Sequence, residues 1–114
     1  MNKIKFDGIY CGLIKKYSDT DTTNTGKKYD TGKLRYDLVK PEMLEAIAEV
    51  MTYGANKYGD NNWQGVETDR YYAALMRHLQ AWRKGELVDE ESGLHHLKHA
   101  LCNIAFILSK ELER

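Results

Sequence analysis

A helical repeat of apolar residues, present three times after residue 40, constrains the fold more than any other feature. It runs over residues 41–59, 70–84 and 93–114, where apolar side chains return every three or four positions, as on one face of an α-helix. Three helices of ordinary length with short connectors predict a mainly α fold, a small helical bundle of three main helices. The expected core-facing residues are Leu44, Ile47 and Met51 in the first helix, Leu75, Leu79 and Trp82 in the second, and Leu94, Leu97, Leu101, Ile104 and Leu108 in the last.

The expected helix ends follow from residues that start or stop helices. Pro41, the single proline, suits the first helical position. Asp69 is expected to cap the second helix, and Ser92 or Glu91 to begin the third. Gly85 is a natural C-terminal stop.

The chain before these helices reads differently. Residues 1–17 carry partly alternating apolar residues, which favour one or two short strands, and the polar stretch 18–26 is typical of a loop. We therefore divide the chain into two parts. Residues 1–26 form a short N-terminal segment of strand or irregular loop structure, and residues 27–114 form a single helical domain.

The last helix is apolar on most sides, because residues 105–107 widen its stripe. A helix of this kind is usually deeply buried, yet a chain of 114 residues buries only about two-thirds of its unfolded surface. We therefore expect a homo-oligomer, a dimer or larger, to complete the bundle.

Composition excludes several classes of protein. Lys plus Arg and Asp plus Glu both number 17, and this balance argues against a general nucleic-acid binder, which usually has a basic excess. No apolar run approaches the roughly 18 residues of a membrane helix, and the start of the chain lacks the apolar core of a signal peptide. We expect a cytoplasmic protein with no membrane partner, in which Cys11 and Cys102 are small hydrophobes.

Polar side chains share one face on each of the last two predicted helices, and these faces would meet if the two helices pack across the bundle. Arginine matches phosphate oxygens, histidine can donate to phosphate, bind a metal or move a proton, and asparagine can read a base edge. These residue types together favour a purine nucleotide, or a signal derived from one, as the ligand of the helical domain. The expected site contains His96, His99 and Asn103 on the last helix, Arg70, Arg77 and His78 on the helix before it, and Asp89 and Glu91 in the connector. For Arg77 and His78 a structural ion-pair role is equally open.

Two segments outside these helices are further candidates for ligand binding. Residues 27–40 form the most basic stretch, with a turn expected at Asp30-Thr31-Gly32; the stretch is either a solvated loop or an arm that grips phosphate through Lys33 and Arg35. Trp63 lies in a turn-rich loop, and it either folds back onto the core or is offered to a ligand or a partner subunit.

Two sets of residues are candidate metal ligands. Glu42, Glu45 and Glu49 lie roughly on one helix face, which either is simply solvated or holds Mg²⁺ together with phosphate oxygens. His96 and His99 are either structural or part of the site, and as metal ligands they would need a third protein group.

The strings KYDTGKLRYDLVKPEMLEAIAEVMTYGANKYGDNNW, RYYAALMRHLQAW and GELVDEESGLHHLKHALCNIAFIL resemble the N-terminal domain of phage dATP/dGTP diphosphohydrolases. The resemblance implies similarity to the all-α, MazG-like nucleotide pyrophosphohydrolases, which form dimers or tetramers. These cleave a nucleoside triphosphate to the monophosphate and pyrophosphate with Mg²⁺, held in the pattern EExxE followed by ExxD. In this chain the glutamates are spaced differently, and His96-x-x-His99 stands where ExxD is expected.

Two functions from different classes remain open. In the first, an Mg²⁺-dependent diphosphohydrolase, Glu45 and Glu49 hold the metal, Lys33, Arg35 and Arg77 neutralise the triphosphate, and a histidine such as His96 or His99, or a glutamate, takes the proton. In the second, a binding protein without chemistry sequesters a nucleotide immune signal, a cyclic nucleotide or a cyclic ADP-ribose isomer, and so blocks host anti-phage defence.

Overall fold

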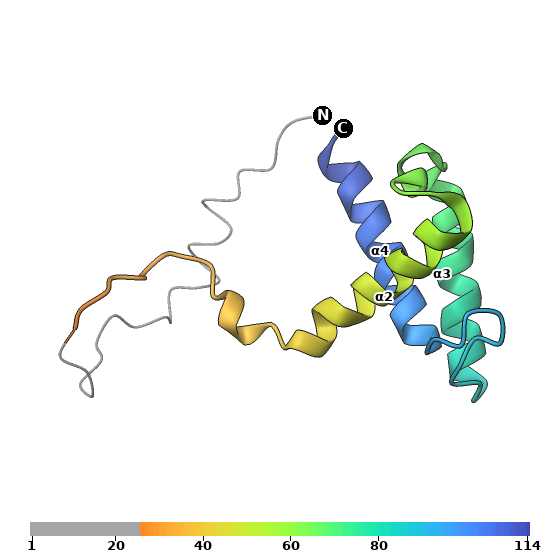
Figure 1. Ribbon diagram of the computed structural model, residues 1–114, viewed down its shortest axis with the longest axis horizontal. Helices are drawn as coiled ribbons and strands as arrows, with labels where there is room; N and C mark the ends of the chain where they lie inside the picture. The colour runs from red at the N-terminus through yellow and green to blue at the C-terminus, as the bar shows by residue number, and fades with distance from the viewer. Residues whose placement is uncertain (1–25) are drawn as a thin grey trace. The chain divides into compact units, whose positions relative to one another are not determined.

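The computed structural model describes residues 26–114, and its α-helices all lie in the part from residue 41 onward, which forms one helical unit. These are α2 (Pro41–Tyr58), α3 (Thr68–Arg83) and α4 (His96–Leu112), and Figure 1 shows α4 running beside both α2 and α3. Within the described residues there is no strand, only an isolated antiparallel bridge between Val88 and His95. The predicted mainly α class with three main helices is confirmed, while the strands expected before residue 26 lie outside the described residues.

Residues 26–40 form a separate unit with little regular structure. The predicted turn is present, since Lys33 N donates to Asp30 O at 3.0 Å and Gly32 has a φ of +85°, which glycine adopts without strain. A short 3₁₀ helix, η1 (Tyr36–Leu38), follows.

The start of α2 at Pro41 is as predicted, whereas the start of α3 is not. α3 begins at Thr68, and its N-cap is Glu67, whose extended backbone (φ −64°, ψ 143°) precedes the helix. Asp69 therefore lies inside the first turn rather than at the cap. Its negative charge still interacts favourably with the helix dipole there. The prediction therefore identified a residue that stabilises the start of the helix but assigned it the wrong position.

The prediction that α4 begins at Ser92 or Glu91 is also wrong. The connector first folds back on itself: Asp89 N donates to Leu94 O at 2.9 Å, and Gly93 N donates to Asp89 O at 2.8 Å. Gly93 has a φ of +74°, a left-handed conformation that no helical residue adopts. The turn delays the helix by several residues.

α4 begins at His96 because His95 provides the cap. The Nδ1 atom of His95 accepts a hydrogen bond from Leu97 N at 3.0 Å, which satisfies one of the free N–H groups at the start of the helix.

The centre of the helical unit is made from small side chains. Cys102 is fully buried, and Ala100 of α4 and Ala46 and Val50 of α2 are almost so. Burial raises the pKa of the Cys102 thiol to about 12, which keeps it protonated and unreactive. The predicted core stripe of α2 is only partly correct: Ile47 is half-buried, but Leu44 is 67% exposed, and the buried residues of α2 are Ala46 and Val50.

Trp63 closes one end of the core. It belongs to the 3₁₀ helix η2 (Asn62–Gly65), and its ring stacks on Phe106 with centroids 4.7 Å apart. Tyr71 packs on the same phenylalanine at 4.9 Å and donates its hydroxyl hydrogen to Trp63 O at 2.9 Å. Of the two roles expected for Trp63, the structure supports folding back onto the core.

The face of α4 that is buried within the single chain is not the apolar stripe. The buried residues are mainly polar or small, and the apolar stripe expected to be deeply buried is largely exposed. The stripe consists of Leu97, Leu101, Ile104 and Leu108, which are 38, 39, 49 and 54% exposed. Water contact with so much apolar surface is unfavourable, so covering by a second subunit stays a prediction. None of the helices in the described range is long and apolar enough to cross a membrane.

Removal of the Phe106 ring tests the aromatic end of the core. Phe106→Ala should lower the free energy of unfolding by about 3 kcal/mol, because both stacking partners lose their contact. Urea denaturation followed by circular dichroism measures the change. Tyr72→Ala, at an aromatic ring 57% exposed on α3, is the control and should change stability by no more than about 0.5 kcal/mol. Equal effects of the two substitutions would show that the aromatic stack contributes nothing specific.

The exposed stripe on α4 predicts an assembly that a single charge should break. Wild-type protein should sediment as a dimer or larger species, and Ile104→Glu should sediment as a monomer, because burying an unpaired carboxylate in an apolar interface is costly. Tyr72→Glu places the same charge on α3 and should leave the assembly intact. A wild-type chain that remains monomeric at high micromolar concentration contradicts the prediction.

Candidate functional site

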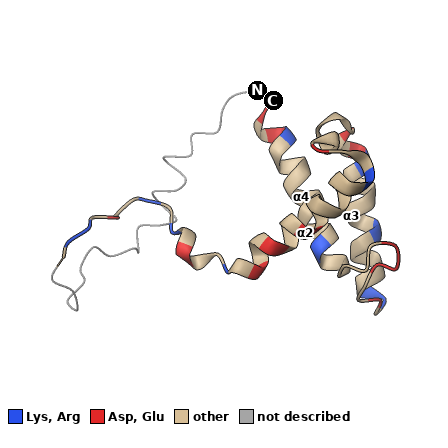
Figure 2. Cartoon of the chain, in the orientation of Figure 1, with Lys and Arg blue, Asp and Glu red and all other residues tan. Residues whose placement is uncertain are grey.

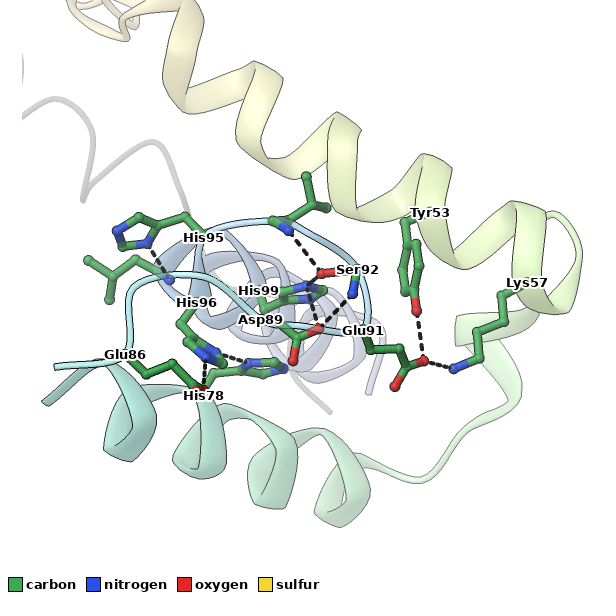
Figure 3. Close-up of polar contacts among 12 residues, drawn as sticks. Tyr53, Lys57, His78, Glu86, Asp89, Glu91, Ser92, His95, His96 and His99 are labelled. Atoms are coloured by element: carbon green, nitrogen blue, oxygen red, sulfur yellow. Dashed lines mark hydrogen bonds and ion pairs between the residues drawn. The ribbon is translucent and has the colours of Figure 1, made fainter. Parts of the chain in front are cut away.

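Three histidines from two helices meet inside the helical unit (Figure 3). The Nδ1 atoms of His78, on α3, and His96, on α4, lie 2.8 Å apart. The ring of His78 also stacks on that of His99, with centroids 4.4 Å apart and planes 6° from parallel. His96 and His99 are 4 and 8% exposed. The prediction that the polar faces of the last two helices bring these histidines together is confirmed.

The connector between α3 and α4 supplies oxygen atoms to the same place. His96 Nε2 lies 2.6 Å from a carboxylate oxygen of Glu86, and His99 Nε2 lies 2.6 Å from the Ser92 hydroxyl. Asp89 accepts a hydrogen bond from Ser92 N at 3.0 Å and lies 3.9 Å from His99 Nε2. Figure 2 shows acidic residues along this loop. We call this set the histidine cluster: His78, Glu86, Asp89, Ser92, His96 and His99.

Burial controls the charge of the cluster. Burial, with smaller contributions from His99 and His96, lowers the pKa of His78 from 6.5 to about 4. Burial also lowers the pKa of His99. For Asp89, burial acts to raise the pKa, but hydrogen bonds from Ser92 and the two nearby imidazoles outweigh it, so the pKa is lowered. At neutral pH the cluster therefore has neutral imidazoles at His78 and His99 beside an ionised carboxylate.

α2 is tied to the connector at one edge of the cluster. The Tyr53 hydroxyl donates to Glu91 at 2.7 Å, and Lys57 forms an ion pair with the same carboxylate. Tyr53 also stands edge-on to the His99 ring, with centroids 6.2 Å apart. Glu91 therefore lies near the site, as predicted, and its contacts there are with Tyr53 and Lys57 of α2.

A cleft of about 640 Å³ opens between α2 and the connector. We call it the Glu49 cleft. Its wall combines two glutamates with neutral polar groups, and Ser92 belongs both to this wall and to the histidine cluster. The residues that line it are Glu45, Ala48, Glu49, Thr52, Tyr53, Asn56, Ser92 and Leu94.

Two of the predicted Mg²⁺ ligands, Glu45 and Glu49, lie in the wall of the Glu49 cleft. Glu45 and Glu49 are four residues apart on one helix and line the same cleft, and proteins often hold Mg²⁺ by one or two carboxylates while phosphate oxygens and waters complete its shell. Glu49 accepts a hydrogen bond from Lys98 Nζ at 2.9 Å. An ion bound at Glu49 would therefore displace an ammonium group, which would be left beside the phosphates.

A second cleft, of about 550 Å³, is formed by α3 and the start of the connector. We call it the Arg77 cleft. Glu86 lines it and contacts His96, so the cluster has a residue in the wall of each cleft. The Arg77 cleft is lined by Met76, Arg77, Gln80, Ala81, Lys84 and Glu86.

Several predicted ligand contacts are not brought together with the cluster. Arg70 is exposed at the start of α3 and lines neither cleft, and Trp63 is packed on Phe106. Asn103 is only 7% exposed and lines neither cleft, so its amide is not presented to a ligand there. Lys33 and Arg35 lie in the separate unit before residue 41, where Arg35 pairs with Asp37 at 2.8 Å; their role with phosphate stays a prediction.

Sequence reasoning missed four polar contributors to the site: Glu86, Tyr53, Asn56 and Lys98. Glu86 directly follows the glycine that ends α3, and the acidic character of the connector was a signal for it. Ser92 was considered only as a helix start. The connector folds back on itself, so that Glu86 contacts His96 and Ser92 contacts His99. This fold depends on backbone hydrogen bonds that cannot be predicted from a local sequence pattern.

Comparison with known proteins assigns a family. The model of the family described as "dATP/dGTP diphosphohydrolase, N-terminal" matches residues 23–114. A relative named dATP/dGTP diphosphohydrolase, from Salmonella phage PMBT28, is 41% identical over 83 residues, which is 73% of this chain and 29% of that protein. The chain thus spans less than a third of the length of this relative. No solved structure matches the chain. From the extent of the family match and the identity to this relative, the chain belongs to the family of dATP/dGTP diphosphohydrolase N-terminal domains.

Proposed function

We propose that this domain binds a purine deoxynucleoside triphosphate and hydrolyses it to the monophosphate and pyrophosphate. The observation that carries the proposal is that Glu45 and Glu49 line a cleft whose wall also contains Ser92, the hydrogen-bond partner of the buried His99. The cleft therefore combines acidic metal ligands with a neutral base, the two groups that metal-assisted hydrolysis needs. The name of the phage relative agrees with this substrate class.

The cleft offers contacts for both ends of such a nucleotide. At the phosphate end, Glu45 and Glu49 would hold Mg²⁺, which when bound neutralises and orients phosphate oxygens. Lys98, once released from Glu49, would contact phosphate in this proposal. At the base end, Asn56 lines the cleft and has the donor and acceptor needed to read a base edge. Asn56 thus takes the base-reading role that the sequence had favoured for Asn103.

His99 is the proton acceptor in this proposal. Its lowered pKa keeps the ring neutral at pH 7, and Ser92 lies 2.6 Å from Nε2. As water attacks a phosphorus atom and the bridging P–O bond breaks, the water gives its proton to the Ser92 oxygen. The Ser92 hydrogen passes to His99, and pyrophosphate leaves. Lys33 and Arg35 remain proposed contributors to neutralising the triphosphate, whereas Arg77, which lines the other cleft, has no part in this proposal.

Replacement of one carboxylate should separate a metal-dependent enzyme from other functions. Glu49→Gln should lower kcat for dGTP and dATP by about 100-fold or more, since the loss of a metal ligand removes several kcal/mol of transition-state stabilisation. Chromatography of the nucleotides after incubation with Mg²⁺ gives the rates. Glu42→Gln, on the same helix but outside the cleft, is the matched control and should keep wild-type activity.

The same measurement also identifies a protein that only binds. If a nucleotide disappears from free solution and returns unchanged when wild-type protein is heat-denatured, catalysis is excluded. Full turnover by Glu49→Gln would exclude Glu49 as an essential ligand.

Ser92→Ala tests the route of the proton. The variant should lose about 10²–10⁴-fold in kcat, the usual contribution of general acid–base catalysis, with little change in KM. Ser92→Thr keeps the hydroxyl and should recover most of the activity. A loss that appears in KM instead, or the absence of rescue by threonine, would assign Ser92 a structural role only.

A further inference from the structure

His78, Asp89 and His96 form a compact three-residue group whose chemistry the hydrolysis proposal does not use. One ligand atom from each residue can be chosen so that all three lie within 4.8 Å of one another. In the part of the chain that the structure describes, these His and Asp side chains are close enough to share a metal ion. His96 is 4% exposed, and His78 and Asp89 are half-buried, so the group is not a chance gathering of surface charges.

The contact between the two imidazoles leaves a lone pair directed into the group. The two Nδ1 atoms are 2.8 Å apart, so only one can carry a hydrogen. His96 Nε2 lies 2.6 Å from a Glu86 carboxylate oxygen, which accepts its hydrogen. In the neutral ring, Nδ1 of His96 then bears the lone pair and faces His78. A metal ion can take the place of the hydrogen that His78 shares with it.

Glu86 in this position matches a recurrent feature of metal sites. Histidines that bind metals usually donate their second ring N–H to a carboxylate, which fixes the tautomer and the orientation of the ring. Asp89 is likewise held in place, by the hydrogen bond from Ser92 N at 3.0 Å. Both the imidazole and the carboxylate ligand thus have an outer partner before any ion binds.

We propose that His78, Asp89 and His96 bind a divalent transition-metal ion of the Zn²⁺ class, with Glu86 as the outer partner of His96. Two nitrogens and one oxygen suit zinc and its neighbours, whereas Mg²⁺ prefers oxygen ligands alone. Three protein ligands leave a position open for water or a phosphate oxygen, as in catalytic rather than purely structural zinc sites. The site is distinct from the Mg²⁺ ligands proposed in the Glu49 cleft and does not depend on the proposed hydrolysis.

Metal titration of the full chain without nucleotide tests this site directly. After chelator treatment and dialysis, calorimetry with Zn²⁺ at pH 7 should show one ion per chain, and Mg²⁺ at the same concentration should give no comparable heat. Co²⁺ should produce visible absorption bands of a four- or five-coordinate site, and Zn²⁺ should raise the Tm because it binds only the folded chain.

Matched variants distinguish this site from adventitious binding. His78→Gln and Asp89→Asn should each weaken Zn²⁺ binding by about 100-fold or more, and Glu86→Gln, which removes only the outer partner, by about 10–100-fold. His95→Asn removes an adjacent histidine outside the cluster while keeping a good helix cap, and it should bind Zn²⁺ as the wild type does.

Two results would overturn the proposal: no stoichiometric Zn²⁺ binding by wild-type protein, or equal binding by folded His78→Gln and Asp89→Asn variants. Circular dichroism establishes folding. If both ligand variants unfold, Glu86→Gln decides, since the Glu86 side chain is 52% exposed and its replacement leaves the core intact. Because no nucleotide is present, failure of metal binding and failure of hydrolysis are separate outcomes.

Discussion

The short contact between His78 and His96 joins the three parts of the chain on which the candidate site depends. It links α3 to α4, and Glu86 extends it to the connector. Buried polar atoms without partners destabilise a protein by about 1–3 kcal/mol each, so the helices can approach only in the arrangement that pairs these nitrogens and oxygens. The cluster therefore fixes the orientation of α4 more narrowly than apolar packing would, because apolar contacts alone have little directionality.

This constraint explains why α4 places its polar face inward. Rotation of the helix to bury Leu101 and Ile104 would expose the apolar groups that surround Cys102 and would separate His96 and His99 from their partners. The small core residues follow from the same arrangement, since an alanine or cysteine at the helix contact lets the imidazole rings meet. The exposed stripe on α4 is thus a consequence of the cluster, and it is the surface that the predicted assembly would cover.

Periodicity and helix signals were enough to predict the three helices, the start of α2 at Pro41 and the meeting of the histidines. They failed where the structure depends on long-range backbone pairing. The bridge between Val88 and His95, with the left-handed turn at Gly93, moves the start of α4, and no local rule distinguishes it from an ordinary Ser cap. Glu86 was missed for the same reason, because its partner is ten residues away. Leu44 was placed in the core because its spacing fits a helix face, but the adjacent face carries the alanine that permits close packing.

In the proposed zinc site, His96 of the His96-x-x-His99 pair is a metal ligand where ExxD was expected. Imidazole ligands suit an ion of the Zn²⁺ class, whereas carboxylates suit an ion that binds oxygen. The carboxylates of α2 keep the oxygen-rich character that suits a phosphate-bound Mg²⁺, and Ser92 lies at the border of the two regions. An ion held by His78, Asp89 and His96 would add positive charge next to His99, which favours its neutral form. A neutral His99 is the state that accepts a proton, so the two proposed sites support each other through electrostatics without sharing a ligand.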